Sequence, residues 1–130
     1  MVDETRRRVL IATGALVVAP PRWAWAGGTA GQPQSLQLTA RDGVLVFGRF
    51  MATPDPGAPL ILLFHQAGSS KDEYGPVQPR LAAEGYASFA IDQRSGGSRL
   101  GGRNETVVAR GGADAGYDDA YPDLEAALAW

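Results

Sequence analysis

The sequence predicts an α/β fold that begins with an antiparallel hairpin and continues with parallel strands and flanking helices. Residues 35–51 hold two short strand-like segments separated by a turn signal, which is the pattern of a hairpin. Two apolar runs follow, LILLF at 60–64 and YASFAI at 86–91, with a helical segment between them. Since strand–helix–strand units cross over right-handed, the two runs should pair in parallel.

Composition excludes several classes of function. The 130 residues are 45% hydrophobic, and the formal net charge is −2, so there is no basic excess to hold nucleic acid. There is no cysteine, which rules out disulfides, thiolate zinc sites and cysteine nucleophiles. A single histidine makes a metal site improbable. No cofactor is predicted, because the paired glycines do not follow a Walker or Rossmann spacing.

Residues 1–26 resemble a bacterial twin-arginine signal peptide. Arginines at 6–8 precede an apolar run at 9–19, which is too short to span a bilayer, and Ala24-Trp25-Ala26 offers the small-x-small pattern of a cleavage site. We therefore expect a periplasmic or secreted protein with no membrane span in the mature chain. An uncleaved anchor is the alternative. Residues 27–34 are rich in Gly and Pro and are expected to form a linker.

The hairpin is expected to turn at Arg41-Asp42-Gly43, where glycine accepts a positive φ. Residues 35–39 alternate apolar and polar side chains, as a half-buried strand does. Residues 44–51 form the second strand. The continuous apolar run at 60–64 is typical of a parallel strand that is covered on both faces.

A helix is expected after the 60–64 strand. Ser69 or Ser70 would cap its start, and Gly85 would end it. Pro76 and Pro79 are awkward inside a helix, so the first part is expected to form a separate turn.

The segment 92–117 is predicted to be a long, glycine-rich loop of a kind that is usually functional or mobile. A last helix should begin at Pro122, and Leu124, Ala127 and Leu128 should share one of its faces.

Three segments taken in order resemble the N-terminal part of the α/β-hydrolase fold family. They are LILLFHQAGSS at 60–70, RLAAEGYASFAID at 80–92 and QRSGG at 93–97, and they follow the hairpin. The pattern is similar to that of dienelactone-hydrolase-like proteins and related esterases and peptidases. The resemblance covers residues 35–130 and departs from the family at Gln66, where glycine is usual. It implies a partial α/β-hydrolase fold that stops before the nucleophile strand.

The resemblance also implies roles for single residues. The backbone N–H of Ala67, together with that of Gln66, would donate to the oxyanion of an acyl-transfer reaction. His65 would shape that loop without acting as the base, as a histidine bonded to the backbone. Asn104 and Glu105 either line the substrate site or cap a short turn.

Other polar residues have two interpretations each. Asp92, at a strand end, is either a catalytic carboxylate or a capping residue of the loop, and the second is favoured. The arginines of the loop either contact a substrate carboxylate or are solvated, and solvation is favoured. They are Arg94, Arg99, Arg103 and Arg110.

The family's nucleophile motif, G-x-S-x-G, does not occur in these residues. The nearest sequence surrounds Ser98, but Leu100 stands where glycine is needed. His65 precedes the position of the family's catalytic histidine. No triad is therefore predicted in this chain, and cutting the fold here would leave the 60–64 strand as an exposed edge.

The sequence thus predicts an N-terminal fragment of an exported serine hydrolase, inactive alone, whose parent acts on a small-molecule ester, lactone or amide. Whether this chain is itself an enzyme stays open. The alternative is a non-catalytic exported binding or interaction module built on the same half-sheet.

Overall fold

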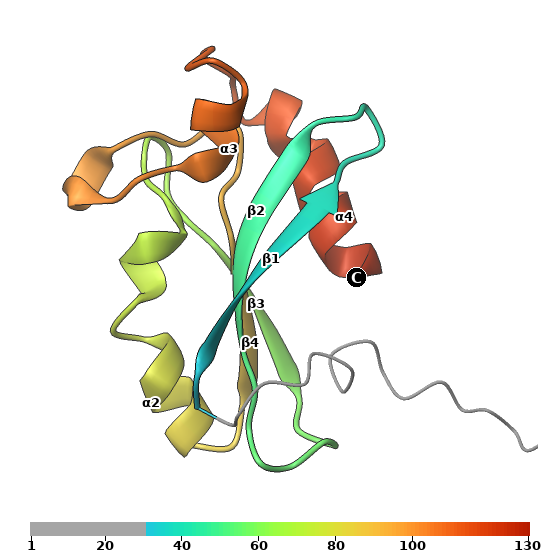
Figure 1. Ribbon diagram of the computed structural model, residues 1–130, viewed down its shortest axis with the longest axis vertical. Helices are drawn as coiled ribbons and strands as arrows, with labels where there is room; N and C mark the ends of the chain where they lie inside the picture. The colour runs from blue at the N-terminus through green and yellow to red at the C-terminus, as the bar shows by residue number, and fades with distance from the viewer. Residues whose placement is uncertain (1–30) are drawn as a thin grey trace, which may run out of the picture.

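A computed structural model describes residues 31–130, which form one mixed four-stranded sheet with helices on both faces (Figure 1). The strand order is β1-β2-β4-β3. β1 and β2 pair antiparallel, β2 and β4 pair antiparallel, and β3 and β4 pair in parallel. Their bounds are Pro33–Thr39 (β1), Leu45–Met51 (β2), Leu60–Phe64 (β3) and Ala87–Ile91 (β4). The hairpin and the parallel pair predicted from the sequence are both confirmed.

The hairpin turns where the sequence indicated. Gly43 has a φ of +85°, and its N–H donates to the carbonyl of Ala40 at 2.8 Å. β1 starts earlier than predicted, because Pro33 already pairs with Met51. The expected linker at 27–34 therefore ends inside a strand. The predicted signal peptide lies outside the described residues.

Two short helices, α2 (Gln78–Ala83) and α3 (Glu105–Ala109), pack on one face of the sheet. A short 3₁₀ helix, η2 at Lys71–Tyr74, precedes α2, so the expected separate turn is confirmed. Pro76 lies between the two helices, whereas Pro79 lies in the first turn of α2. The hydroxyl of Ser70 caps η2 by accepting from the N–H of Asp72 at 3.3 Å. α2 ends before Gly85, whose φ is +87°.

The opposite face carries α4, Tyr121–Ala129, which lies across the sheet from α2 and α3 (Figure 1). The prediction of a continuous loop at 92–117 is wrong in part. The segment contains α3 and a one-turn 3₁₀ helix at Arg99–Gly101 (η3), and another, Asp118–Ala120 (η4), leads into α4. Since α3 has only five residues, no apolar periodicity could reveal it. Within residues 31–130, no helix is both long and apolar enough to cross a bilayer.

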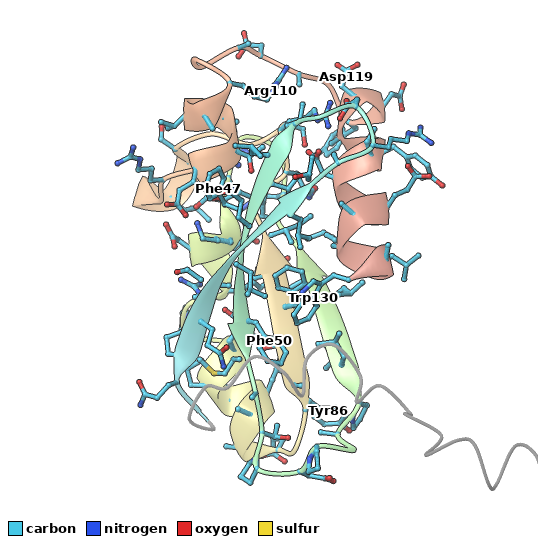
Figure 2. The ribbon with its side chains drawn as sticks, turned by 45° about the vertical axis from the view of Figure 1, so that its right-hand side comes forward. Phe47, Phe50, Tyr86, Arg110, Asp119 and Trp130 are labelled. Carbon is cyan, nitrogen blue, oxygen red and sulfur yellow. The ribbon has the colours of Figure 1, made fainter. Side chains whose placement is uncertain are left out.

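The core lies between the sheet and α4. Phe50, Phe89 and Ile91 are fully buried. The Trp130 ring packs on Phe50 (Figure 2) and on Phe89, with centroid separations of 5.2 and 4.8 Å. Of the three residues expected to share one face of the last helix, Ala127 is buried and Leu124 is half-buried, but Leu128 is 78% exposed. That part of the prediction is wrong, because the helix turns Leu128 away from the sheet.

β3 is an edge strand within the described sheet. All five of its apolar residues are only half-buried. Apolar edges of this kind are prone to pair with further strands.

Candidate functional site

The loops that follow β3 and β4 lie against each other at the carboxyl edge of the sheet, where open α/β sheets place their ligands. The first loop spans residues 65–70, and the second spans residues 92–104. Three backbone hydrogen bonds join them, from Gly68 N–H to Ser95 O (3.1 Å), from Gly97 N–H to Ser69 O (2.8 Å) and from Arg99 N–H to Gly68 O (2.9 Å). Each loop therefore holds the other in place.

His65 lies buried between the two loops. Its Nε2 accepts from the N–H of Gln93 at 2.9 Å, so the ring proton belongs on Nδ1, which donates to the carbonyl of Gln66 at 2.8 Å. Both ring nitrogens are thus engaged with the backbone. This arrangement fits the expected loop-shaping histidine and leaves no free lone pair for general-base work.

Asn104 connects both loops to α3. Its Nδ2 donates to Gln93 O (2.9 Å) and Ser69 O (3.2 Å), and its Oδ1 caps α3 by accepting from Val107 N–H at 2.8 Å. The side chain is buried, so of its two predicted roles the structure confirms the cap.

Gly96 makes this junction possible. A Cβ at this position would come within 1.9 Å of Asn104 Nδ2, 2.4 Å of Ser69 O and 2.8 Å of His65 Cε1. Only glycine leaves the space that the Asn104 amide occupies.

Gln66 and Ala67 form the exposed tip of the first loop. The Gln66 carbonyl turns inward and accepts from His65 Nδ1 and from Ser69 N–H at 3.1 Å. The Ala67 N–H faces outward and donates to the hydroxyl of Tyr117 at 3.1 Å. The predicted oxyanion donor thus already has an acceptor, the hydroxyl oxygen of Tyr117.

Asp92 is fully buried behind the loops and caps two helices at once. Its Oδ1 accepts from Lys71 N–H (2.7 Å), and its Oδ2 accepts from Glu105 N–H (2.7 Å) and Lys71 Nζ (2.8 Å). The sequence predicts that Asp92 caps a turn of the glycine-rich loop, and the structure instead shows it accepting from the first residues of η2 and α3. The Glu105 carboxylate, a predicted substrate-loop group, also accepts from Lys71 Nζ, at 2.5 Å. Burial lowers the pKa of the Lys71 ammonium, but its bonds to the two carboxylates outweigh burial, so the net pKa is raised.

Arg94 corrects the expectation that the loop arginines are solvated. It is buried and binds two carboxylates, those of Asp123 in α4 and Asp42 in the hairpin turn. Hydrogen bonding from Arg94 lowers the pKa of Asp42 from 3.8 to about 2. Arg99 and Arg103 are exposed, as expected, and Arg110 is half-buried, with its guanidinium donating to the Ala113 carbonyl.

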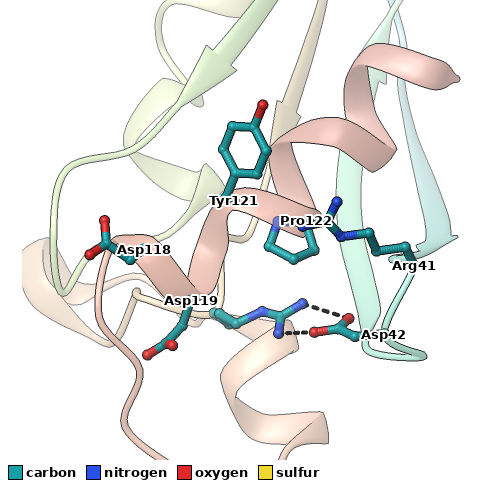
Figure 3. Close-up of a pocket in the computed structure, with 7 residues that line it drawn as sticks. Arg41, Asp42, Asp118, Asp119, Tyr121 and Pro122 are labelled. Carbon is teal, nitrogen blue, oxygen red and sulfur yellow. Dashed lines mark hydrogen bonds and ion pairs between the residues drawn. The ribbon is translucent and has the colours of Figure 1, made fainter.

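An open hollow of about 470 Å³ lies over this ion pair, between the hairpin turn and the start of α4 (Figure 3). Its lining includes Arg41, Asp42 and Asp119. Of the lining residues, Asp42 pairs with Arg94, whereas Arg41 pairs with Glu125 outside the lining, and no lining residue belongs to the 65–70 loop. Nor do three His, Cys, Asp or Glu side chains in the described part of the chain come together to hold a metal ion.

Ser98, the serine nearest to a nucleophile motif, is exposed and precedes the one-turn helix η3. Leu100 follows it with a φ of +62°. No strand runs into Ser98, so it does not lie on a strand-to-helix elbow.

Sequence reasoning missed Lys71 and Tyr117. Their partners are 21 and 50 residues away, and the only local signals were a lysine beside a helix cap and a tyrosine at a helix start.

No family model and no curated protein matches this sequence. Solved structures do match. An esterase of Pyrococcus furiosus, in one crystal form, is 26% identical with a TM-score of 0.52, covering 76% of this chain and 35% of that chain. A thermostable carboxyl esterase of Bacillus coagulans is 16% identical with a TM-score of 0.54, covering 75% of this chain and 30% of that chain.

A monoglyceride lipase of Saccharomyces cerevisiae is 24% identical with a TM-score of 0.53, covering 80% of this chain and 32% of that chain. The chain has a partial α/β-hydrolase fold. It spans about a third of the length of the structures that it matches. Within this partial fold, the 65–70 loop lies at the carboxyl edge of the sheet and is hydrogen-bonded to the 92–104 loop.

Proposed function

We propose that this chain contributes the oxyanion loop and the first four strands of an exported serine hydrolase. The reaction is transfer of an acyl group from an ester, lactone or amide to a serine and then to water. The nucleophile, the acid and the catalytic histidine would come from outside these 130 residues.

The observation that carries the proposal is the outward N–H of Ala67 on an exposed tip, below which His65 is buried and hydrogen-bonded to Gln66 and Gln93. Donors of this kind stabilise an oxyanion because they need no reorganisation when charge develops. The loop is fixed by His65, Asn104 and the backbone bonds to residues 93–99, so its N–H groups are preorganised.

The names of the similar structures support an ester as the substrate. They are an esterase, a carboxyl esterase and a monoglyceride lipase. The formal net charge of −2 provides no basic excess for nucleic acid.

The test begins with the reading frame downstream of the Trp130 codon. We expect a G-x-S-x-G motif, followed by an acidic residue and a histidine in that order. The protein as encoded should hydrolyse p-nitrophenyl acetate and take up a fluorophosphonate label at the motif serine. Replacing that serine by alanine should abolish both, whereas Ser98→Ala should change neither. A protein that ends at Trp130, unfolds cooperatively as a monomer and hydrolyses nothing would contradict the proposal.

Export rests on the arginines of residues 1–26 and has its own test. Changing Arg6, Arg7 and Arg8 to lysine should leave the protein in the cytoplasm of a bacterial host. Export that continues unchanged would refute a twin-arginine route without touching the catalytic proposal.

A further inference from the structure

Tyr117 reaches the oxyanion loop from the far end of the 92–117 segment. Its hydroxyl oxygen lies 3.1 Å from the Ala67 nitrogen and accepts the hydrogen bond of that amide, although the residues are 50 positions apart. The side chain is 64% exposed, so packing alone does not explain this position.

The backbone of Tyr117 is anchored on both sides. Its carbonyl accepts from Ala120 N–H at 3.0 Å in the first turn of η4, and the N–H of Gly116 donates to Asp119 Oδ2 at 2.8 Å. The hydrogen bonds on either side therefore hold the Tyr117 backbone in place next to the loop.

The phenol retains an unused donor. A tyrosine hydroxyl both accepts and donates, and here the Ala67 amide uses the acceptor side. No acceptor for the hydroxyl proton is found in the part of the chain that the structure describes. The hydroxyl proton and the Ala67 N–H are therefore two hydrogen-bond donors that lie next to each other at the tip of the loop.

We propose that Tyr117 is a catalytic residue whose O–H donates to the same substrate oxygen as the Ala67 N–H. The inference rests on the proposed function, since it names a second donor for the same oxyanion. The Ala67 nitrogen and the phenol oxygen are 3.1 Å apart, so a substrate oxygen must lie in front of them and not between them. To accept from both groups it displaces the phenol from the Ala67 N–H, and the exposed ring turns its O–H toward the same oxygen. Until substrate arrives, the hydrogen bond from the Ala67 N–H to the phenol oxygen holds the two donors next to each other, and it strengthens the phenol as a donor.

A competing role has the opposite consequence. If the hydroxyl merely fills the place of the substrate oxygen, it must leave before reaction, and removing it speeds catalysis. As a donor, its removal slows catalysis, since losing one oxyanion donor lowers kcat on the order of 10²-fold or more.

The experiment compares the wild-type protein as encoded with Tyr117→Phe, and with Tyr121→Phe as a matched control. Tyr121 is also an exposed tyrosine, four residues further on, and it lies on the hollow over Asp42 and not on the loop. For hydrolysis of p-nitrophenyl acetate, we expect Tyr117→Phe to lower kcat on the order of 10²-fold, with KM and the melting temperature nearly unchanged. Tyr121→Phe should keep the wild-type kcat.

Each outcome has one meaning. An active wild type with an equally fast or faster Tyr117→Phe variant overturns the inference and leaves the proposed function intact. A wild type that neither hydrolyses the ester nor takes up the fluorophosphonate label refutes the proposed function, and the inference falls with it. A loss shared by Tyr121→Phe also overturns the inference, because the effect is then not specific to the loop.

Discussion

The carboxylate of Asp123 accepts from both the main chain and the side chain of Arg94, with Arg94 N–H at 2.8 Å and Nη2 at 2.7 Å. Asp123 is fully buried at the first turn of α4, whereas Arg94 follows β4. The pair therefore connects the helix on one face of the sheet to the loop at its carboxyl edge.

Replacing Arg94 with methionine should destabilise the protein by about 3–5 kcal/mol, because the Asp123 carboxylate would stay buried without its cation. Urea unfolding measures the loss. Arg41→Met is the control, since the ion pair between Arg41 and Glu125 is 66% and 37% exposed and is worth below about 1 kcal/mol. Equal losses of unfolding free energy in the two variants would show that the buried Asp123 carboxylate does not need Arg94 for stability.

Because the Arg94 guanidinium also binds Asp42, the free energy of unfolding should vary with pH in the acidic range. Hydrogen bonding to Arg94 lowers the pKa of Asp42 from 3.8 to about 2 in the folded protein. A lowered carboxyl pKa stabilises the fold above the unfolded value, and the contribution is lost as pH falls from about 4 to about 2. The unfolding free energy of the wild type should therefore drop more steeply across that window than that of Asp42→Asn. Parallel curves would contradict the assignment.

Gly96→Ala should disrupt the junction of the two loops. The new methyl group would overlap Asn104 Nδ2 at 1.9 Å and Ser69 O at 2.4 Å, and overpacking of this kind costs about 1–3 kcal/mol or more. Gly116→Ala is the matched control, because its nearest neighbour would be Asp119 Oδ2 at 3.6 Å. Thermal melting compares the two, and an unchanged melting temperature for Gly96→Ala would be at odds with the close approach.

His65→Phe keeps an aromatic ring but removes the acceptor of the Gln93 N–H. The buried amide would lose its partner, at a cost of about 1–3 kcal/mol by chemical denaturation. In the wild type, long-range ¹H–¹⁵N spectra should find the proton on Nδ1. A ring protonated on Nε2 instead would exclude the hydrogen bond from Gln93.

The strands could be predicted because their signals are local. The run at 60–64 and the glycine at 43 each specify their structure within a few residues. The close contact of Gly48 in β2 with the Phe89 ring in β4 cannot be predicted from the sequence alone. A Cβ at Gly48 would come within 2.3 Å of Phe89 Cε2, so the glycine in β2 is explained only once both strands are in place.

The candidate site was predictable only in outline. The sequence located the turn at 65–67 and suggested that His65 shapes it and that Asn104 caps a turn. It gave no sign that Asn104 also bonds to Ser69 and Gln93, or that Lys71 joins Asp92 to Glu105. Such contacts depend on which loops meet at the sheet edge, and residue patterns within one segment do not encode that.

The three backbone bonds between the 65–70 and 92–104 loops have a kinetic consequence. Since Gly68 N–H, Gly97 N–H and Arg99 N–H each donate across the boundary, none of these amides can reach water unless the loops separate. All three should exchange with deuterium through one shared opening event, at closely similar rates. The tip that carries Ala67 thus belongs to one cooperative unit with residues roughly thirty positions further along the chain, and a mutation in either loop slows or hastens the opening of both.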